Sequence, residues 1–450
     1  MRLKRAAAMT MACMMTAAMA LAGCGGKTET KESAAAAGSS GAAAGSTQAA
    51  AASETSAAKS GGKAMELTYW TLESRKAAAE PIVEEWNNTH DDVKIVLSIY
   101  STDGMKDACK VAASSKTLPN MWFNWGGSLG GFYAENGLTY DLTEYAEKNN
   151  WSEKFSENSL KLTTLGGQLC GYPNSYKVVG IYYKKDIFEK LGLEVPSTFE
   201  EFEQVCAALK ENGITPISTG GLNGWHTMRF VELLFEHYAG AELHDKMNTF
   251  EESVDNEAVV KAFEKYQEFC EKGYFPEGFM TQDPNDTLIA LATGQCAMDV
   301  QGPWYDAQII RNEQNPADYG VFAFPSGGTN RMSAFVEMTQ FNVDNTEEEL
   351  EACIEFMDFF HSQENVEKYS EGFSLPLALL DAKLVDSQPN VPVLMDTSKE
   401  NGVFLITDQA FPTEVADVLF NAQDAIANGQ MTPQDAAKNL QEAIENYKNK

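Results

Sequence analysis

The stretch VVGIYYKKDIFEKLGLEVPSTFEEFEQVCAALKENG (178–213) places a strand directly before a helix. Its first eight residues are mostly β-branched and aromatic and end in two lysines, which predicts a strand over 178–185. Four apolar side chains then recur at helical spacing: Phe199, Phe202, Cys206 and Leu209. We expect Ser197 and Glu200 to form a capping box at the start of this helix and Gly213 to end it. A strand followed by a helix is the repeating unit of an α/β fold.

The same alternation occurs near the start of the globular part. Three segments have the composition of short strands: 65–70, 93–100 and 120–125. Between them lie two predicted helices, one near 103–115 and one with the stripe Ala79, Ile82, Val83 and Trp86. This order predicts an α/β domain with a largely parallel sheet. Thr346 with Glu349 and Thr432 with Pro433 mark the starts of two later helices.

The first 63 residues differ from the rest of the chain. Arg2, Lys4 and Arg5 precede an uncharged Ala- and Met-rich run that ends in Leu-Ala-Gly-Cys24. Residues 1–23 resemble a bacterial lipoprotein signal peptide, in which Cys24 would become the lipidated first residue; the alternative is an ordinary cleaved signal with a chance cysteine. Residues 25–63 contain no aromatic or branched aliphatic side chain, so we expect 24–63 to be a flexible, lipid-anchored tether.

Residues 64–450 are too many for one ordinary domain and suit two. The net charge of −31 argues against a nucleic-acid partner, because binding phosphates requires clustered Lys and Arg. Six cysteines follow Cys24 at wide, irregular spacings: Cys109, Cys170, Cys206, Cys270, Cys296 and Cys353. This spacing does not suit zinc, and we expect mostly buried free thiols.

Signatures of metal or phosphate chemistry are missing from the sequence. It has no H-E-x-x-H, G-x-x-x-x-G-K-[ST] or EF-hand loop, and its five histidines do not pair at metal-ligand spacing. We therefore expect no metal, no cofactor and no catalytic residue. A glycosidase-like pair of carboxylates remains an alternative, because Asp and Glu are abundant.

Aromatic residues beside glycines or at strand ends are the better candidates for a site. They are Trp70, Trp122, Trp125, Tyr172, Tyr176, Trp225, Trp304 and Tyr305. Ligands of α/β sheets bind at the carboxyl ends of strands, and an indole offers a flat apolar face with one donor. Such faces suit the C–H patches of neutral sugars. Trp86 and Trp151, on predicted helices, are assigned to the core, and Trp122 is expected to point into it.

Several stretches, in order, resemble the extracellular solute-binding proteins of ABC importers, the class that includes the maltose-binding protein. They are ELTYW (66–70), VEEWNNTHDDVKIVL (83–97), LPNMWFNWGGSLGGFYAENGLTYDLTEY (118–145), GQLCGYPNSYKVVGIYYKKDIFEKLGLEVPSTFEEFEQVCAALKENGITPI (167–217), LATGQCAMDVQGPW (291–304) and EGFSLP (371–376). The stretch 167–217 is the longest match. It has Tyr183-Lys184-Lys185-Asp186 where the family usually has YNKD. The resemblance covers residues 66–450.

The resemblance implies two α/β lobes that close like a hinge on a ligand in the cleft between them. The first lobe would comprise about 65–175 and 337–377, the second about 178–334 and 378–450. Carried over by position, the ligand-binding residues would be Trp70, Glu73, Asn124, Trp125, Gly127, Ser128, Tyr176, Lys177, Trp225, His226, Trp304, Glu337, Gly372 and Phe373. The protein would act as a monomer on the outer face of the cell membrane, anchored through Cys24, and would pass a carbohydrate to the ABC permease.

Two positions depart from the family pattern. Lys184 stands where Asn is usual, at a strand end where little effect is expected. Lys177 stands where sugar-binding relatives often present an acidic group, which leaves the identity of the ligand open. A polyamine, an amino acid derivative or another small polar solute is the alternative ligand, and a surface glycosidase is the alternative class of protein.

Overall fold

The computed structural model describes residues 64–373 and 375–450. The predictions made for residues 1–63, namely the signal peptide, the lipidated Cys24 and the tether, lie outside this part of the chain. Within the described part, no helix is long and apolar enough to cross a bilayer.

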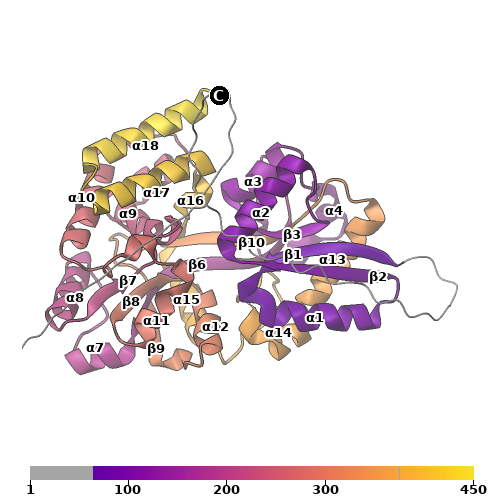
Figure 1. Cartoon of the computed structure of the whole chain (residues 1–450), viewed down its shortest axis with the longest axis horizontal. Coiled ribbons are helices and arrows are strands. Elements are labelled where there is room, and N and C mark those ends of the chain that lie inside the picture. The colour runs from indigo at the N-terminus through magenta and orange to yellow at the C-terminus, as the bar shows by residue number, and fades with distance from the viewer. Residues whose placement is uncertain (1–63, 374) are drawn as a thin grey trace, which may run out of the picture. The chain divides into compact units, whose positions relative to one another are not determined.

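One sheet of nine strands, in the order β2-β1-β3-β10-β6-β8-β7 with β11 beside β10 and β9 beside β6, organises the body (Figure 1). The strands are β1 (Met65–Leu72), β2 (Val93–Tyr100), β3 (Met121–Trp125), β6 (Tyr172–Lys184), β7 (Thr215–Ser218), β8 (Cys296–Gln301), β9 (Tyr319–Phe322), β10 (Met332–Phe341) and β11 (Val403–Leu405). A two-stranded ladder, β4 (Thr164–Leu165) with β5 (Gln168–Leu169), is separate.

The sheet is mixed rather than largely parallel. β1 is parallel to both β2 and β3, as predicted for that segment, and β7 is parallel to β8. In the middle, β10 is antiparallel to β3 and to β6, and β6 is antiparallel to β8. β6 and β10 run between the two groups of strands (Figure 1), so the fold consists of two α/β lobes joined by these crossing strands.

Helices cover both faces of the sheet (Figure 1). In the first part of the chain they are α1 (Lys76–Thr89), α2 (Thr102–Ser115), α3 (Gly127–Glu135), α4 (Thr143–Lys148), α5 (Trp151–Lys154), α6 (Glu157–Thr163), α7 (Lys185–Leu191), α8 (Phe199–Glu211), α9 (Trp225–Asn248, kinked at Gly240) and α10 (Glu257–Glu271). The later ones are α11 (Thr287–Ala292), α12 (Trp304–Arg311), α13 (Glu347–Phe360), α14 (Gln363–Lys368), α15 (Asn390–Asn401), α16 (Thr407–Ala410), α17 (Thr413–Ala427) and α18 (Pro433–Lys448). Short 3-10 turns include η1 (Glu73–Arg75), η3 (Pro284–Asp286) and η5 (Ser370–Gly372).

The buried apolar side chains form three clusters. The largest joins α2 and β3 to α8, α9, α10, α17 and α18. A second lies under α1 and α13, and a third lies between β6, α11 and α12. α13 packs against α1 and β1 although more than 250 residues separate them in sequence. The lobe boundaries given above remain a prediction.

Local sequence signals place the elements that they mark, although β6 begins at Tyr172 whereas the predicted strand begins at 178. Thr346 and Glu349 form the predicted capping box, but the earlier box is shifted by one residue: Thr198 and Glu201 form it, not Ser197 and Glu200. α8 starts at Phe199, and the cap is the extended residue immediately before it. Trp86, Trp122 and Trp151 are buried, as predicted.

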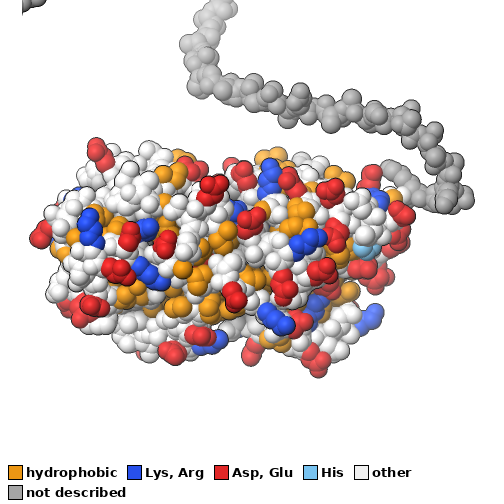
Figure 2. All heavy atoms as spheres, turned by 90° about the horizontal axis from the view of Figure 1, so that it is seen from below, with side chains coloured by type: hydrophobic (Ala, Val, Ile, Leu, Met, Phe, Trp, Pro, Cys, Tyr) orange, Lys and Arg blue, Asp and Glu red, His pale blue; other side chains and the backbone are white. Residues whose placement is uncertain are grey.

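The six cysteines of the described residues are free thiols, and all except half-buried Cys270 are buried. This confirms the prediction made from their spacing. Figure 2 shows acidic side chains spread over one face of the body among neutral and apolar ones rather than gathered in one place. Such a distribution favours solubility over a docking site for a polycation.

Candidate ligand-binding cleft

The carboxyl ends of three parallel strands meet at one edge of the sheet and form one wall of a cleft. β1, β2 and β3 end at Leu72, Tyr100 and Trp125, and parallel strands bring such ends together. The segments after them contribute Glu73, Ser74, Arg75, Ser101, Thr102 and Lys106 to a cavity of about 480 Å³. This volume is typical of sites for small molecules.

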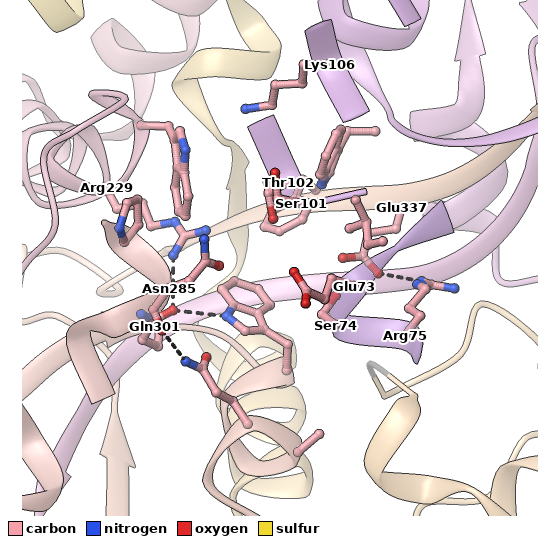
Figure 3. A pocket seen from close by; sticks show the side chains of 18 of the residues that line it. Glu73, Ser74, Arg75, Ser101, Thr102, Lys106, Arg229, Asn285, Gln301 and Glu337 are labelled. Atoms are coloured by element: carbon pink, nitrogen blue, oxygen red, sulfur yellow. Dashed lines mark hydrogen bonds and ion pairs between the residues drawn. The ribbon is translucent and has the colours of Figure 1, made fainter. Parts of the chain in front are cut away.

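Segments from distant parts of the chain form the opposite wall (Figure 3). They supply polar and charged side chains: Arg229, Asp283, Asn285, Asp286, Gln301, Gln308, Arg311, Asp408 and Gln409. Three of these segments begin helices, since α9, α12 and α16 start at or near residues that line the cleft.

Three tryptophans line the cleft. Trp125 ends β3, whereas Trp225 and Trp304 are the first residues of α9 and α12. The indole Nε1 of Trp304 donates to Oε1 of Gln301 at 3.0 Å. A Cβ atom on Gly302 would lie 2.2 Å from the Trp304 ring, so only glycine at position 302 lets the indole lie against the backbone.

Two cationic side chains contact these indoles. The Cζ atom of Arg229 lies 4.7 Å from the ring centroid of Trp225 and 4.8 Å from that of Trp304. Nζ of Lys106 lies 5.3 Å from the Trp125 centroid and 5.8 Å from that of Trp225. These distances permit cation–π attraction, which restrains the indole planes before a ligand arrives.

A buried group of charges lies where the two crossing strands meet. Oε2 of Glu337 accepts from Nη2 of Arg75 at 2.9 Å and from Oγ of Ser175 at 2.7 Å, and Nζ of Lys177 lies 3.9 Å away (Figure 3). The β6–β10 pairing shifts register between Glu337 and Met338. Burial lowers the pKa of Lys177 to about 7, and the nearby Glu337 carboxylate limits this decrease.

Contacts on two sides of the cleft join segments of the two predicted lobes. Oδ2 of Asp103 accepts from Nδ2 of Asn223 at 2.6 Å and from Nε1 of Trp225 at 3.5 Å. On the other side, Nη1 of Arg311 donates to the carbonyl oxygen of Glu371. The described conformation is therefore one in which both sides touch across the cleft.

Six of the fourteen predicted site residues line this cleft: Glu73, Trp125, Trp225, Trp304, Glu337 and Phe373. Eight do not line it: Trp70, Asn124, Gly127, Ser128, Tyr176, Lys177, His226 and Gly372. Several of the eight lie directly behind it. Nζ of Lys177 donates to the carbonyl oxygen of Leu375, and Asn124 donates to Oε1 of Gln340.

The other members of the eight have structural contacts. Trp70 packs on Tyr100, and Tyr176 is in the core. His226 is buried, and its Nδ1 accepts from the backbone N of Gly220. A Cβ on Gly372 would meet the backbone of Ala78, and one on Gly127 would meet the carbonyl oxygen of Gln409.

Gly126-Gly127-Ser128-Leu129-Gly130 matches the G-x-S-x-G pattern of serine hydrolases. A nucleophilic serine needs a hydrogen bond to a base. The Ser128 hydroxyl instead donates to the backbone carbonyl oxygen of Asp408 at 3.3 Å. This contact is structural, and it ties the start of α3 to α16.

Sequence reasoning missed most of the charged lining. Arg75 and Lys106 follow strands β1 and β2, so the strand-end rule that selected Trp125 would also have found them. Arg229 lies one helical turn after Trp225, a spacing that places both on one side of α9. Nothing local marks 283–286 or 408–409, because only the tertiary structure brings them to the cleft.

Comparisons with known proteins agree with this architecture. A family model described as "Bacterial extracellular solute-binding protein" matches residues 69–367. An uncharacterized ABC transporter extracellular-binding protein of Pyrococcus horikoshii is 24% identical over 277 residues, 58% of this chain and 60% of the relative. A multiple sugar-binding protein of Streptococcus mutans is 23% identical over 280 residues, 61% of this chain and 64% of the relative. The chain thus aligns with less than two thirds of the length of these relatives.

Solved structures share the fold. A chitin oligosaccharide binding protein superposes with a TM-score of 0.78 and 22% identity, covering 86% of this chain and 99% of that one. A maltose-bound protein of T. maritima gives a TM-score of 0.73 at 19% identity, covering 85% and 99%. At these identities the likeness establishes the two-lobed fold.

Proposed function

We propose a function for this chain on the premise that it belongs to the family of bacterial extracellular solute-binding proteins. The protein is a receptor that binds a sugar or oligosaccharide in its cleft and delivers it to the permease of an ABC transporter. A sugar-binding relative and oligosaccharide-binding structural neighbours support this proposal. The observation that carries it is the presence of three tryptophans, Trp125, Trp225 and Trp304, in one polar cleft.

The chemistry of this lining fits a saccharide. An indole face packs against the C–H patch of a pyranose ring, while carboxylates, amides and guanidinium groups bond the hydroxyls at its rim. The Glu337 carboxylate is already oriented by Arg75 and Ser175, so a ligand hydroxyl meets an acceptor that needs little reorganisation.

The charge of the lining does not by itself separate the alternative ligands from a sugar. Four cations, Arg75, Lys106, Arg229 and Arg311, share the cavity with five acidic residues, Glu73, Asp283, Asp286, Glu337 and Asp408. The family and the structural neighbours are binding proteins rather than enzymes. The polyamine alternative predicts that affinity falls steeply with ionic strength, whereas affinity for a neutral sugar would change little.

A thermal-shift screen tests the ligand class. The purified protein is heated with mono- and oligosaccharides, amino acids and polyamines. A ligand present at 100 times its Kd and bound only by the folded state adds about 2.7 kcal/mol, so we expect a higher Tm with one group of saccharides. If Tm rises only with polyamines or amino acids, the proposed ligand is wrong while the receptor fold stands.

We also propose that Cys24 carries a lipid anchor and that 25–63 tether the body to the outer face of the membrane. A receptor that must reach a permease in the same membrane needs both retention and reach. Cys24→Ser is expected to move the protein from the membrane fraction to the culture medium, as followed by immunoblot. Retention of this variant on the membrane, with Cys13→Ser as the control, would contradict the anchor.

A further inference from the structure

Arg229 is a buried cation in the cleft wall, and no carboxylate of the described residues hydrogen-bonds it. It is 8% exposed. Within residues 64–373 and 375–450, its hydrogen bonds come from Nη1, to Oε1 of Gln301 at 3.1 Å and to the carbonyl oxygen of Val300 at 3.5 Å, and its Nε has no partner. A guanidinium has five N–H donors, so much of its bonding capacity is unused.

The indoles on either side of Arg229 do not compensate for the hydrogen bonds to water that its guanidinium loses on burial. Trp225 and Trp304 flank the guanidinium at 4.7 and 4.8 Å, and they restrain its plane. Cation–π contacts offset part of the lost hydration but accept no strong hydrogen bond. Burial lowers the pKa of Arg229 to about 10, so the group remains charged at neutral pH.

Nearby carboxyl groups act on Arg229 only through space. Asp408, Asp299 and Glu232 raise its pKa by their charge. Burial raises the pKa of Glu232 to about 8, which leaves that carboxyl largely protonated at neutral pH. Asp299 accepts from the Tyr305 hydroxyl at 2.9 Å. The positive charge of Lys106, like that of Arg229, lowers the pKa of Asp408.

We propose that the guanidinium of Arg229 binds a carboxylate of the ligand, and that the cleft therefore selects an acidic saccharide, one that carries a uronic acid. The inference rests on the proposed sugar-binding function. A planar guanidinium pairs with a carboxylate through two parallel hydrogen bonds, and the two indoles hold it in a fixed plane for that contact. Figure 3 shows Arg229 and Gln301 on the same side of the cleft, facing the wall that carries Glu73 and Ser101.

Matched pairs of saccharides test the proposal by calorimetry on the purified full chain. The pairs, each differing by one carboxylate, are cellobiose with cellobiouronate, galactobiose with galactosyl-galacturonate, and glucosyl-xylotriose with glucuronosyl-xylotriose. For the pair that binds, the acidic member is expected to bind about 10- to 100-fold more tightly, the value of one hydrogen-bonded charge pair. Its affinity should also fall with ionic strength, unlike that of the neutral member.

Variants assign the effect to Arg229. In Arg229→Gln the preference for the acidic member should disappear, and in Arg229→Lys it should persist in weaker form. Arg311→Gln, which removes an equal charge from the same cleft, should reduce the preference for the acidic member much less than Arg229→Gln does, because it removes only through-space attraction. If Arg229→Gln does not fold, Arg229→Lys and the ionic-strength series on the natural protein still test whether Arg229 binds the carboxylate of the ligand.

Three outcomes would overturn the proposal. If the neutral member binds as tightly as the acidic one, the acidic class is wrong while sugar binding stands. If Arg311→Gln rather than Arg229→Gln abolishes the preference, the assignment to Arg229 is wrong. If no saccharide binds and another solute does, the proposed function itself fails.

Discussion

Arg75→Met is expected to lower the free energy of unfolding by about 3 kcal/mol, because it leaves a buried carboxylate without its main partner. Arg75 is 3% exposed and donates to Glu337 at 2.9 Å. Lys177, at 3.9 Å, compensates in part: the Arg75 charge lowers the pKa of Lys177, so removing Arg75 raises that pKa and strengthens the remaining pair. The loss should therefore fall at the lower end of the range for broken buried pairs, about 3–5 kcal/mol. Urea unfolding followed by tryptophan fluorescence measures it.

An exposed pair provides the matched control for Arg75. Lys399 and Asp396 are both 71% exposed, so Lys399→Met should cost less than about 0.5 kcal/mol. The double variant Arg75→Met/Glu337→Met should recover part of the loss, because it removes both charges. Equal small losses for Arg75→Met and Lys399→Met would contradict the buried pair.

Trp304→Ala is expected to weaken binding of the cognate saccharide by about 2 kcal/mol or more, roughly 30-fold. The indole lines the cleft, and its position is set by the bond to Gln301 and by the space above Gly302. Truncation removes the flat apolar face and one of the two hydrogen bonds that Oε1 of Gln301 accepts. Isothermal titration calorimetry with the sugar found in the screen gives the change in Kd.

The exposed aromatic residue Phe132, 45% accessible and outside the cleft, serves as the control. Phe132→Ala should leave the Kd within about twofold. Trp125→Ala tests the facing wall and should also weaken binding. If Trp304→Ala and Trp125→Ala both bind sugar like the natural protein, stacking does not hold the ligand.

The elements were predictable where the determining interactions are local. The order of strands and helices from β1 to β3 follows from apolar spacing over a few residues, and Thr346 with Glu349 marks the start of α13. The start of α8 lies one residue later than predicted, because Ser197 and Thr198 both suit a cap and it is the Thr198 hydroxyl that accepts from the backbone N of Glu201. The mixed sheet was not predictable, because strand direction at β6 and β10 depends on partners more than 150 residues away.

The candidate site divides in the same way. Trp125 and Trp304 are predicted from their places at a strand end and beside a glycine, and Glu337 only from its position relative to the family. Asp408 and Asn285 carry no local signal, and they reach the cleft only through the packing of α16 and η3. Lys177 was assigned to the ligand from its position, yet in the structure it is fully buried and bonds Leu375.

Local patterns therefore predict the α/β class, the bounds of the first strands and helices, the buried thiols and the resemblance to a solute receptor. Those features depend on interactions between residues close in sequence or on motifs that are contiguous in the sequence. The packing of distant segments determines which side chains share the cleft and which charges are paired. It also places Arg229 between two indoles, where no carboxylate of the described residues hydrogen-bonds it. Such properties depend on distances between residues far apart in sequence and on their burial, and no local pattern specifies either.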